Sequence, residues 1–305
     1  MAVVVLDQVS RWYGQVLGLN RVSVSLAPGV TGLLGPNGAG KSTFMKLITG
    51  LLRPSAGVVR VLGESPWDNP ALMRRIGYVP DIDSFYEEMT GRELVTMLTR
   101  LHGFSPSEAA DRAERALQDV RLGDAMDRPV ARYSKGMRQK CKMAQAIAHE
   151  PDLLVLDEPL TGADPVSRHH LIELVRRMAR ERGTSVIVSS HVLHEVEALT
   201  REILLIHRGR VLAEGSVRQL RDLIDEHPHR VHIGCDKPRE LAALAVAQPF
   251  VLAARVRDEV LELETPDPAT CYRELPRLAL EAGLRLRTIT SPDNSIEAVF
   301  RYLVG

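Results

Sequence analysis

A glycine-rich segment that carries a lysine and two hydroxyl side chains is the part of this sequence best equipped for chemistry. It reads Gly35-Pro36-Asn37-Gly38-Ala39-Gly40-Lys41-Ser42-Thr43. Glycines at this spacing allow backbone amides to approach phosphate oxygens closely. The Lys41 ammonium can then reach the β- and γ-phosphates of a nucleotide, and the Ser42 hydroxyl can bind Mg²⁺. The residues predicted to bind phosphate are Asn37, Gly38, Ala39, Gly40, Lys41, Ser42 and Thr43.

The segments on both sides have the patterns of a strand and a helix, which a phosphate-binding loop requires. Residues 30–34 form a short apolar run that predicts a buried strand, and residues 44–51 carry the apolar spacing of a helix. The positive end of that helix favours a bound anion. This setting favours a nucleotide site over a simple glycine-rich turn. Kinases, GTPases and transport ATPases share the loop, so the loop alone does not define the reaction.

Two further segments place side chains suited to hydrolysis at the ends of predicted strands. Apolar residues 153–156 are followed by Asp157 and Glu158, and a predicted strand over 184–189 is followed closely by His191. The carboxyl ends of parallel strands meet at one edge of a sheet. We expect Asp157 to hold Mg²⁺, Glu158 to polarise the attacking water and His191 to contact the γ-phosphate. Glu158 and His191 are therefore the predicted catalytic residues.

An inserted helical subdomain is predicted over residues 85–150, between these groups of motifs. Its first helix begins near Thr90, and Glu93 stands three residues later, as in a capping box. The second helix has Pro106 at its first position, where proline is favoured. A third helix is predicted over 133–149. The alternation of strands and helices on either side of the insertion predicts an α/β core with a largely parallel sheet.

The start of the third helix carries the most specific further signal, Tyr133-Ser134-Lys135-Gly136-Met137-Arg138-Gln139. With Leu160-Thr161-Gly162-Ala163-Asp164-Pro165 and His191, in that order after the phosphate loop, it resembles the nucleotide-binding subunits of ATP-binding cassette (ABC) transporters. The resemblance covers about residues 3–220. It implies a P-loop NTPase with the ABC ATPase fold, a mixed sheet core with an inserted helical subdomain, that binds ATP and Mg²⁺.

The resemblance also assigns roles to single residues. The family signature is usually Leu-Ser-Gly-Gly-Gln, and it contacts the ATP held by a partner subunit. The corresponding residues here are Ser134, Lys135, Gly136 and Met137. Asp164 corresponds to the aspartate of the D-loop, and Tyr13 to the aromatic residue that stacks on adenine. Because a lysine would crowd the signature loop, we expect the Lys135 side chain to point to solvent.

A second departure from the family pattern is Asp81, which stands where a glutamine commonly touches the metal and the membrane partner. A carboxylate at this position can still bind Mg²⁺. The departures at Asp81 and in the signature resemble those of exporters whose membrane subunits are separate ABC-2 permeases. The resemblance therefore implies a subunit that forms a head-to-tail homodimer around two Mg-ATP. It would drive an integral membrane permease and lie at the inner face of the cell membrane.

The composition changes near residue 215, and residues 225–305 are predicted to form a second, small domain. Its patterns run strand, helix, strand, strand, helix, strand, with a last helix over 295–303, which indicates a ferredoxin-like α+β sandwich. A closing helix over 216–224 would end the ATPase domain, which we place at residues 1–224. The sequence leaves open whether the second domain holds two ATPase subunits together or carries a regulatory ligand site.

The composition narrows the remaining choices. The 305 residues include 39 Lys and Arg and 39 Asp and Glu, so we expect no nucleic-acid partner. Three widely separated cysteines fit a reducing compartment, and no apolar run reaches the roughly 18 residues of a membrane span, so we expect a cytoplasmic protein. Two alternatives stay open: a soluble ABC ATPase that acts on ribosomes or DNA, and a nucleotide-regulated scaffold without turnover. Measured hydrolysis of Mg-ATP would exclude the scaffold, and co-purification with a membrane protein would exclude the soluble ATPase.

Overall fold

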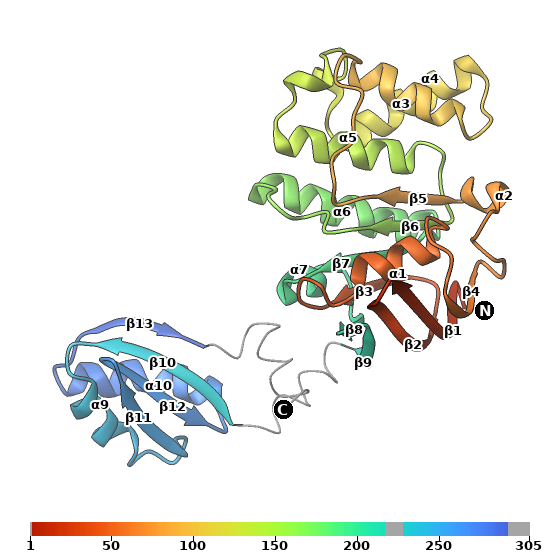
Figure 1. The fold of residues 1–305 in the computed structure, drawn as a ribbon. Coiled ribbons are helices and arrows are strands. Elements are labelled where there is room, and N and C mark those ends of the chain that lie inside the picture. The colour runs from red at the N-terminus through yellow and green to blue at the C-terminus, as the bar shows by residue number, and fades with distance from the viewer. Residues whose placement is uncertain (1, 217–227, 292–305) are drawn as a thin grey trace. The chain divides into compact units, whose positions relative to one another are not determined.

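The structure, a computed structural model, describes residues 2–216 and 228–291. The chain divides into two compact units, residues 1–215 and 216–305, and each is described by itself (Figure 1). The domain boundary predicted at residue 225 lies outside the described residues. The same holds for the helix predicted over 295–303 and for nearly all of the helix predicted over 216–224.

A six-stranded sheet in the order β5-β6-β7-β3-β8-β9 forms the centre of the N-terminal unit. Its strands are β3 (Val30–Leu34), β5 (Ile76–Val79), β6 (Leu153–Leu156), β7 (Ser185–Ser190), β8 (Glu202–His207) and β9 (Arg210–Ser216). Neighbours from β5 to β8 are parallel, as predicted. Strands β8 and β9 were not predicted. They are joined by Arg208 and Gly209, both with positive φ, as in a tight hairpin turn.

Both faces of this sheet are covered, and strand β6 shows how. Its alternate residues Leu153 and Val155 belong to a core that includes Phe44 of helix α1 (Lys41–Ile48). Leu154 and Leu156 belong to a second core, with side chains of helix α6 (Pro165–Glu181). Continuous apolar sequence is therefore required in β6, because neither face meets water. The first core is closed by an antiparallel sheet of β2 (Val16–Leu26), β1 (Val4–Tyr13) and β4 (Ala56–Val61).

Three longer helices form the predicted helical subdomain: α3 (Gly91–Arg100), α4 (Pro106–Asp119) and α5 (Lys135–Ile147) (Figure 1). The predicted capping box is present in α3, because the Thr90 hydroxyl accepts a hydrogen bond from the Glu93 amide at 3.2 Å and Glu93 Oε2 accepts one from the Thr90 amide at 2.9 Å. The described part of the unit also contains two short α-helices, α2 (Pro70–Met73) and α7 (Leu193–Glu197), and two 3₁₀ helices, Gly123–Ala125 and Val130–Arg132. No helix in the described part of the chain is long and apolar enough to cross a membrane.

The C-terminal unit is a four-stranded antiparallel sheet in the order β11-β12-β10-β13. Its elements are β10 (His229–Cys235), α9 (Pro238–Ala245), β11 (Ala253–Arg257), β12 (Val260–Thr265), α10 (Pro268–Glu281) and β13 (Leu286–Thr290). This is the strand order of two interlocked split βαβ units, so the ferredoxin-like prediction is confirmed. Val231 and Leu263 on the sheet pack with Leu241 and Leu275 on the helices, while alternate strand residues remain outside this core.

Candidate active site

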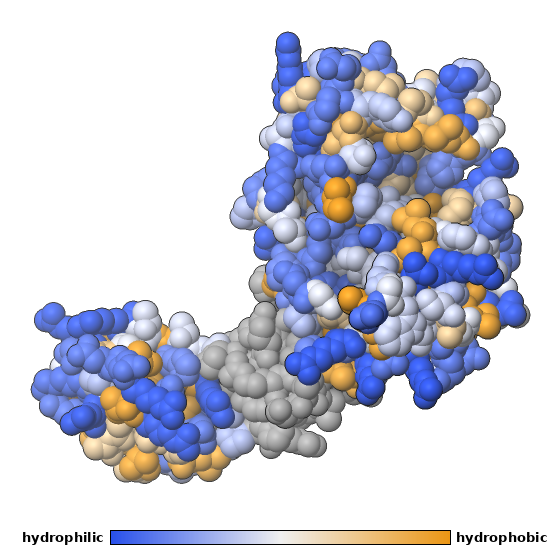
Figure 2. Space-filling view, viewed as in Figure 1, coloured by the Kyte–Doolittle hydropathy of each residue, from blue (hydrophilic) through white to orange (hydrophobic). Residues whose placement is uncertain are grey.

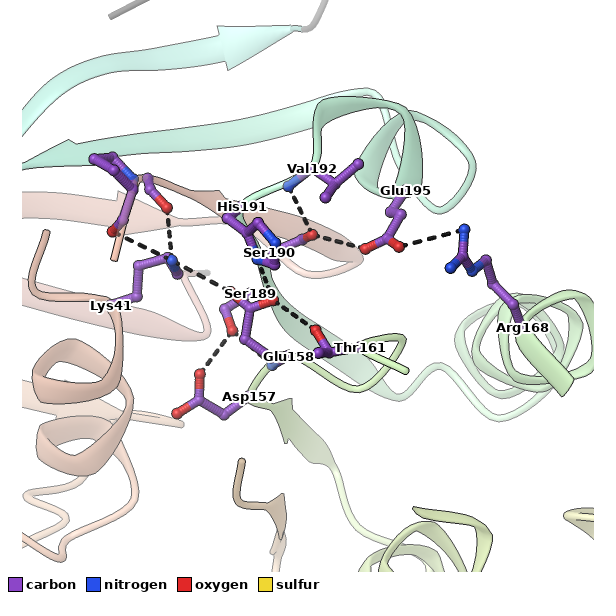
Figure 3. A network of polar contacts seen from close by, with 12 residues as sticks. Lys41, Asp157, Glu158, Thr161, Arg168, Ser189, Ser190, His191, Val192 and Glu195 are labelled. Carbon is purple, nitrogen blue, oxygen red and sulfur yellow. Dashed lines mark hydrogen bonds and ion pairs between the residues drawn. The ribbon is translucent and has the colours of Figure 1, made fainter. Parts of the chain in front are cut away.

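The carboxyl edge of the central sheet brings the two predicted carboxylates and the histidine segment together (Figure 3). Asp157 follows β6 directly, and its amide donates to Val79 O of the neighbouring β5 at 2.9 Å. From the other side, the Ser189 hydroxyl of β7 donates to Asp157 Oδ1 at 2.7 Å and accepts from the Glu158 amide at 2.8 Å. Asp157 is 3% exposed. The Asp157 backbone is therefore fixed by β5, and its carboxylate is oriented by Ser189 of β7.

The Glu158 carboxylate is the meeting point of the site. Its Oε1 lies 3.3 Å from Lys41 Nζ, and its Oε2 lies 2.9 Å from His191 Nδ1 and accepts from the Thr161 hydroxyl at 3.1 Å. The backbone of Glu158 has φ 50°, in the left-handed region. Holding a residue with a β-carbon there costs about 1–3 kcal/mol and is found most often at functional sites. The surrounding contacts therefore force the glutamate into a fixed, strained position.

Lys41 and the loop before it form a cradle at the start of α1. The Lys41 ammonium is nearly buried and donates to Gly35 O at 2.6 Å. Gly40 precedes the helix with φ 111°, and an added Cβ would lie 2.7 Å from Gly18 O, so only glycine fits. No side chain caps this helix end, whose first amides lack partners within the helix. Ala39 is buried, whereas Asn37 and Gly38 are exposed, so the loop presents its backbone to a phosphate group.

The oxygen atoms near this cradle suit Mg²⁺. Ser42 is exposed in the first turn of α1, Asp157 follows β6, and Asp81 follows the adjacent β5. Burial is the main cause that raises the pKa of Tyr78 to about 12, and the charges of Asp157 and Asp81 add to the increase. No group of three His, Cys, Asp or Glu side chains in the described residues could hold a metal by itself. A bound Mg²⁺ would therefore also use hydroxyl and phosphate oxygens, as it usually does.

A second polar network holds the segment that carries His191 (Figure 3). The Ser190 hydroxyl accepts from the Val192 amide at 3.0 Å and donates to Glu195 Oε2 at 2.8 Å. The other oxygen of Glu195, which is nearly buried, lies 3.5 Å from the Arg168 guanidinium of α6. These contacts hold the chain on both sides of His191, and the ring itself is positioned by its contact with Glu158.

The expected adenine-stacking residue lies beside the phosphate loop. Tyr13 ends β1, and its hydroxyl lies 3.3 Å from Thr43 Oγ1. The Arg11 guanidinium lies over the Tyr13 ring, 5.1 Å from its centroid. Tyr13 nevertheless remains 41% exposed. Tyr13 is therefore close enough to the cradle to contact a nucleotide bound there.

The signature residues occupy a different and exposed part of the unit. Ser134 caps α5, and its hydroxyl accepts from the Met137 amide at 3.3 Å. Lys135 is exposed, but its ammonium lies over Gly162, where an added Cβ would come within 2.6 Å of it. Gly136 borders open space, while Met137 packs partly against the core. No hydrogen bond among the described residues links this segment to the phosphate loop.

Asp164 sits near this surface as the N-cap of α6. Its Oδ1 accepts from the amides of Val166 and Ser167, each at 3.0 Å. The hydrogen bonds from Ser167 are the main cause that lowers the pKa of Asp164 below its ordinary value. The side chain is exposed and carries a negative charge at neutral pH.

Comparisons with known proteins agree with this geometry. The family model described as ABC transporter matches residues 19–161. The Nod factor export ATP-binding protein I of Rhizobium sp. (strain N33) is 36% identical over 309 residues, which span 98% of this chain and 96% of that protein. The chain belongs to the ATP-binding subunits of ABC transporters. It therefore binds nucleotide and hydrolyses ATP for a membrane transporter.

Other ABC proteins give the same result. The daunorubicin/doxorubicin resistance ATP-binding protein DrrA of Streptomyces peucetius is 37% identical over 90% of this chain and 84% of that protein. The solved structure of an ATP-binding subunit of an ABC transporter has a TM-score of 0.66 and 31% identity, over 72% of this chain and 92% of that one. A dimeric bacterial ABC transporter cassette, at 23% identity, shares the fold with a TM-score of 0.66.

Sequence analysis of this ABC subunit missed several residues that hold the site together. Ser189 binds both Asp157 and the Glu158 backbone, and Glu195 links Ser190 to Arg168. The two serines directly before His191 were a visible signal, because hydroxyl groups at a strand end can bind a neighbouring strand end. Nothing local indicated Arg168, which lies on another helix.

Proposed function

We propose that this ABC subunit powers an exporter. It pairs head to tail with a second copy, hydrolyses Mg-ATP at two shared sites and drives a separate membrane permease. The relatives named for Nod factor export and for daunorubicin/doxorubicin resistance support the exporter assignment. The first of these matches extends over 98% of the chain and so includes most of the C-terminal unit. In this proposal residues 1–224 form the ATPase domain and residues 225–305 an accessory domain.

The observation that carries the proposal is the convergence of Lys41 and His191 on Glu158. A γ-phosphate in the cradle would offer Lys41 an anionic partner in place of Glu158. The glutamate oxygen released in this way would be available to accept a proton from the attacking water, as general base. His191, held by its neighbours, would donate to the γ-phosphate. The residues assigned to catalysis are therefore Glu158 and His191.

Ser42 and Asp157 would hold Mg²⁺, with Asp81 on the adjacent strand end as a further ligand. The ion would neutralise the charge that develops on the β- and γ-phosphates during transfer. The fit rests on the orientation of Asp157 by Ser189 and on the parallel pairing of β5 and β6, which places Asp81 and Asp157 at the same edge of the sheet. Tyr13 would stack on the adenine ring, since its exposed ring stands next to Thr43.

The signature segment supplies the argument for a second copy. Ser134 and the amides at the start of α5 form an anion-binding end of a helix that is exposed and that makes no hydrogen bond with the phosphate loop among the described residues. In a head-to-tail pair, the residues Ser134, Lys135, Gly136 and Met137 of one copy would close over the ATP held by the other. Asp164 is exposed two residues after Gly162, over which the Lys135 ammonium lies, so it would lie at the contact between copies.

Apolar side chains near the helical subdomain support a permease partner. Ile82 is 72% exposed, Tyr86 63% and Leu101 74%, and they lie before and after α3. Figure 2 shows apolar side chains at the surface of this subdomain. Large exposed apolar groups often mark protein contacts. The permease would place the subunit at the inner face of the membrane.

The decisive experiment measures Mg-ATP hydrolysis by the purified chain beside its Glu158→Gln variant. We expect turnover in the native protein and its loss, with retained ATP binding, in the variant. Equal rates in the two proteins would show that Glu158 is not the base. Co-purification of the tagged chain with a membrane protein from its own cells tests the transporter role separately.

A further inference from the structure

Lys142 is a nearly buried ammonium group outside the site described above. It lies in α5, is 3% exposed, and has three oxygen partners. Its Nζ donates to Pro80 O at 2.9 Å and to Asp81 O at 3.1 Å, and lies 2.8 Å from Asp83 Oδ1. An ammonium has three protons to donate, and burying it is unfavourable unless each finds an acceptor. All three are therefore engaged by one short segment, residues 80–83.

This segment is the point where the chain leaves the central sheet for the helical subdomain. It follows β5, whose last residue, Val79, accepts the hydrogen bond from the Asp157 amide. Asp81 is thus carried on the strand end next to Asp157, and its charge contributes to the raised pKa of Tyr78. Residues 81–84 are exposed, and the hydrogen bonds and ion pair from Lys142 hold this segment to α5.

The helix that supplies Lys142 also begins with the signature residues. Ser134 caps α5 about 12 Å before Lys142, eight residues at the rise of a helix. The middle of α5 is packed into the core through Cys141 and Met143 on either side of the lysine. A helix packed in this way moves as a rigid body, so a shift of residues 80–83 relative to Lys142 is also a shift relative to Ser134.

We propose that Lys142 is a positioning residue that clamps residues 80–83, and with them Asp81, to the helix that presents Ser134. Asp81 belongs to the ATP site of its own subunit, whereas Ser134 would contact the ATP of the partner subunit. The clamp therefore connects these two sites through one helix. This inference rests on the proposed function, because it assigns the clamp a part in turnover. The clamp itself is a property of the single chain and can be measured without nucleotide.

The first test compares Lys142→Met with the matched control Lys140→Met, which removes a less buried lysine two residues away on α5. Methionine keeps the length of the side chain and removes the ammonium. We expect kcat for Mg-ATP to fall roughly tenfold to a hundredfold in Lys142→Met, because misplacing a catalytic group by about 1 Å has effects of this size. The KM for ATP should change little, since Lys142 does not contact the phosphate loop. Lys142→Arg, which keeps the charge, should recover most of the loss.

The second test follows amide hydrogen exchange in the nucleotide-free chain. Exchange at residues 81–84 should be faster in Lys142→Met than in the native protein and in Lys140→Met, while exchange in β6 should be unchanged. If Lys142→Met does not fold, Asp83→Asn removes the charge from the half-exposed end of the ion pair and should produce the same changes to a smaller degree.

Unchanged exchange at residues 81–84 would overturn the clamp. Faster exchange with a native kcat would overturn its part in turnover. A failure of the proposed function looks different, because the native chain would then hydrolyse no Mg-ATP while the exchange measurement still reported on the clamp.

Discussion

The phosphate-loop side and the signature side of the N-terminal unit differ in how far their charged and polar groups are buried and in whether these groups have partners in the same chain. Lys41, Asp157 and Glu158 are mostly buried, and each is held by partners in the same chain. Ser134 and Lys135 are exposed, and the Ser134 hydroxyl caps only its own helix. A buried charge without a partner destabilises the fold by several kcal/mol, whereas an exposed cap does not depend on further contacts. The first group is thus complete within one chain, and the second can be shared with another molecule.

The largest expected effect is at Lys41, the most enclosed charge of the phosphate-loop side. Lys41→Ala should reduce Mg-ATP hydrolysis by about 10³-fold, because it removes the cation nearest the developing phosphate charge. ATP binding measured by equilibrium dialysis should weaken as well. Lys46→Ala, in the last turn of the same helix, is the control and should stay near the native rate. If Lys41→Ala were as active as this control, Lys41 would not be needed for hydrolysis, and the contrast between the phosphate-loop side and the signature side would be wrong.

At Glu158 we expect a loss of turnover without a loss of binding. Glu158→Gln keeps the shape of the side chain and removes the proton acceptor. A general base typically raises the rate by about 10²-fold or more. ATP should remain bound, and with it a dimer that can be detected by size-exclusion chromatography. Loss of ATP binding in this variant would mean that the glutamate is needed for the cradle rather than for hydrolysis.

Mixing two inactive variants tests directly whether the two sides come from different copies. Ser134→Arg should abolish turnover but leave ATP binding to the single chain intact. When it is mixed with Lys41→Ala, half of the dimers are mixed and each contains one intact shared site, so about a quarter of the native activity should return. No recovery, with mixed dimers shown to form, would argue that each chain hydrolyses ATP alone.

The smallest expected effect concerns stability on the signature side, where α5 is followed by the nearly buried His149. Burial, mainly, and the nearby His102 ring lower the pKa of His149 from 6.5 to about 4. The unfolded chain therefore takes up a proton as the pH falls below about 6.5, while the folded chain does so only near 4. Because the unfolded chain binds more protons, the free energy of unfolding should fall by about 2 kcal/mol between pH 7 and pH 5.

Urea unfolding of the native chain and of His149→Gln at both pH values checks this prediction. The decrease in unfolding free energy from pH 7 to pH 5 should be about 2 kcal/mol smaller in the variant. The amide can still donate to Ile76 O, the partner of the His149 ring at 3.1 Å. An equal decrease in both proteins would show that His149 is not the group that titrates.

Much of the fold was predictable because the relevant signals are local. The capping box of Thr90 and Glu93 lies within one turn, and it starts α3 as predicted. The strand-helix alternation and the ferredoxin-like order are likewise patterns of neighbouring residues. Strands β8 and β9 were not predicted, although their turn at Arg208 and Gly209 is also local. The change of composition near residue 215 was interpreted only as a domain boundary.

The candidate site divides in the same way. The sequence by itself determined which groups are available for chemistry: the glycines and lysine of a phosphate loop, carboxylates after one strand and a histidine after another. Their spacing follows from the backbone geometry of a strand, a turn and a helix, so it can be read from adjacent residues.

Only the tertiary structure decided how these groups are held. Ser189 joins two strand ends, Glu195 joins α7 to α6, and Lys142 joins α5 to residues 80–83. Each of these contacts spans distant sequence, and it forms only because packing of the sheet and helices brings the partners together and buries their charges.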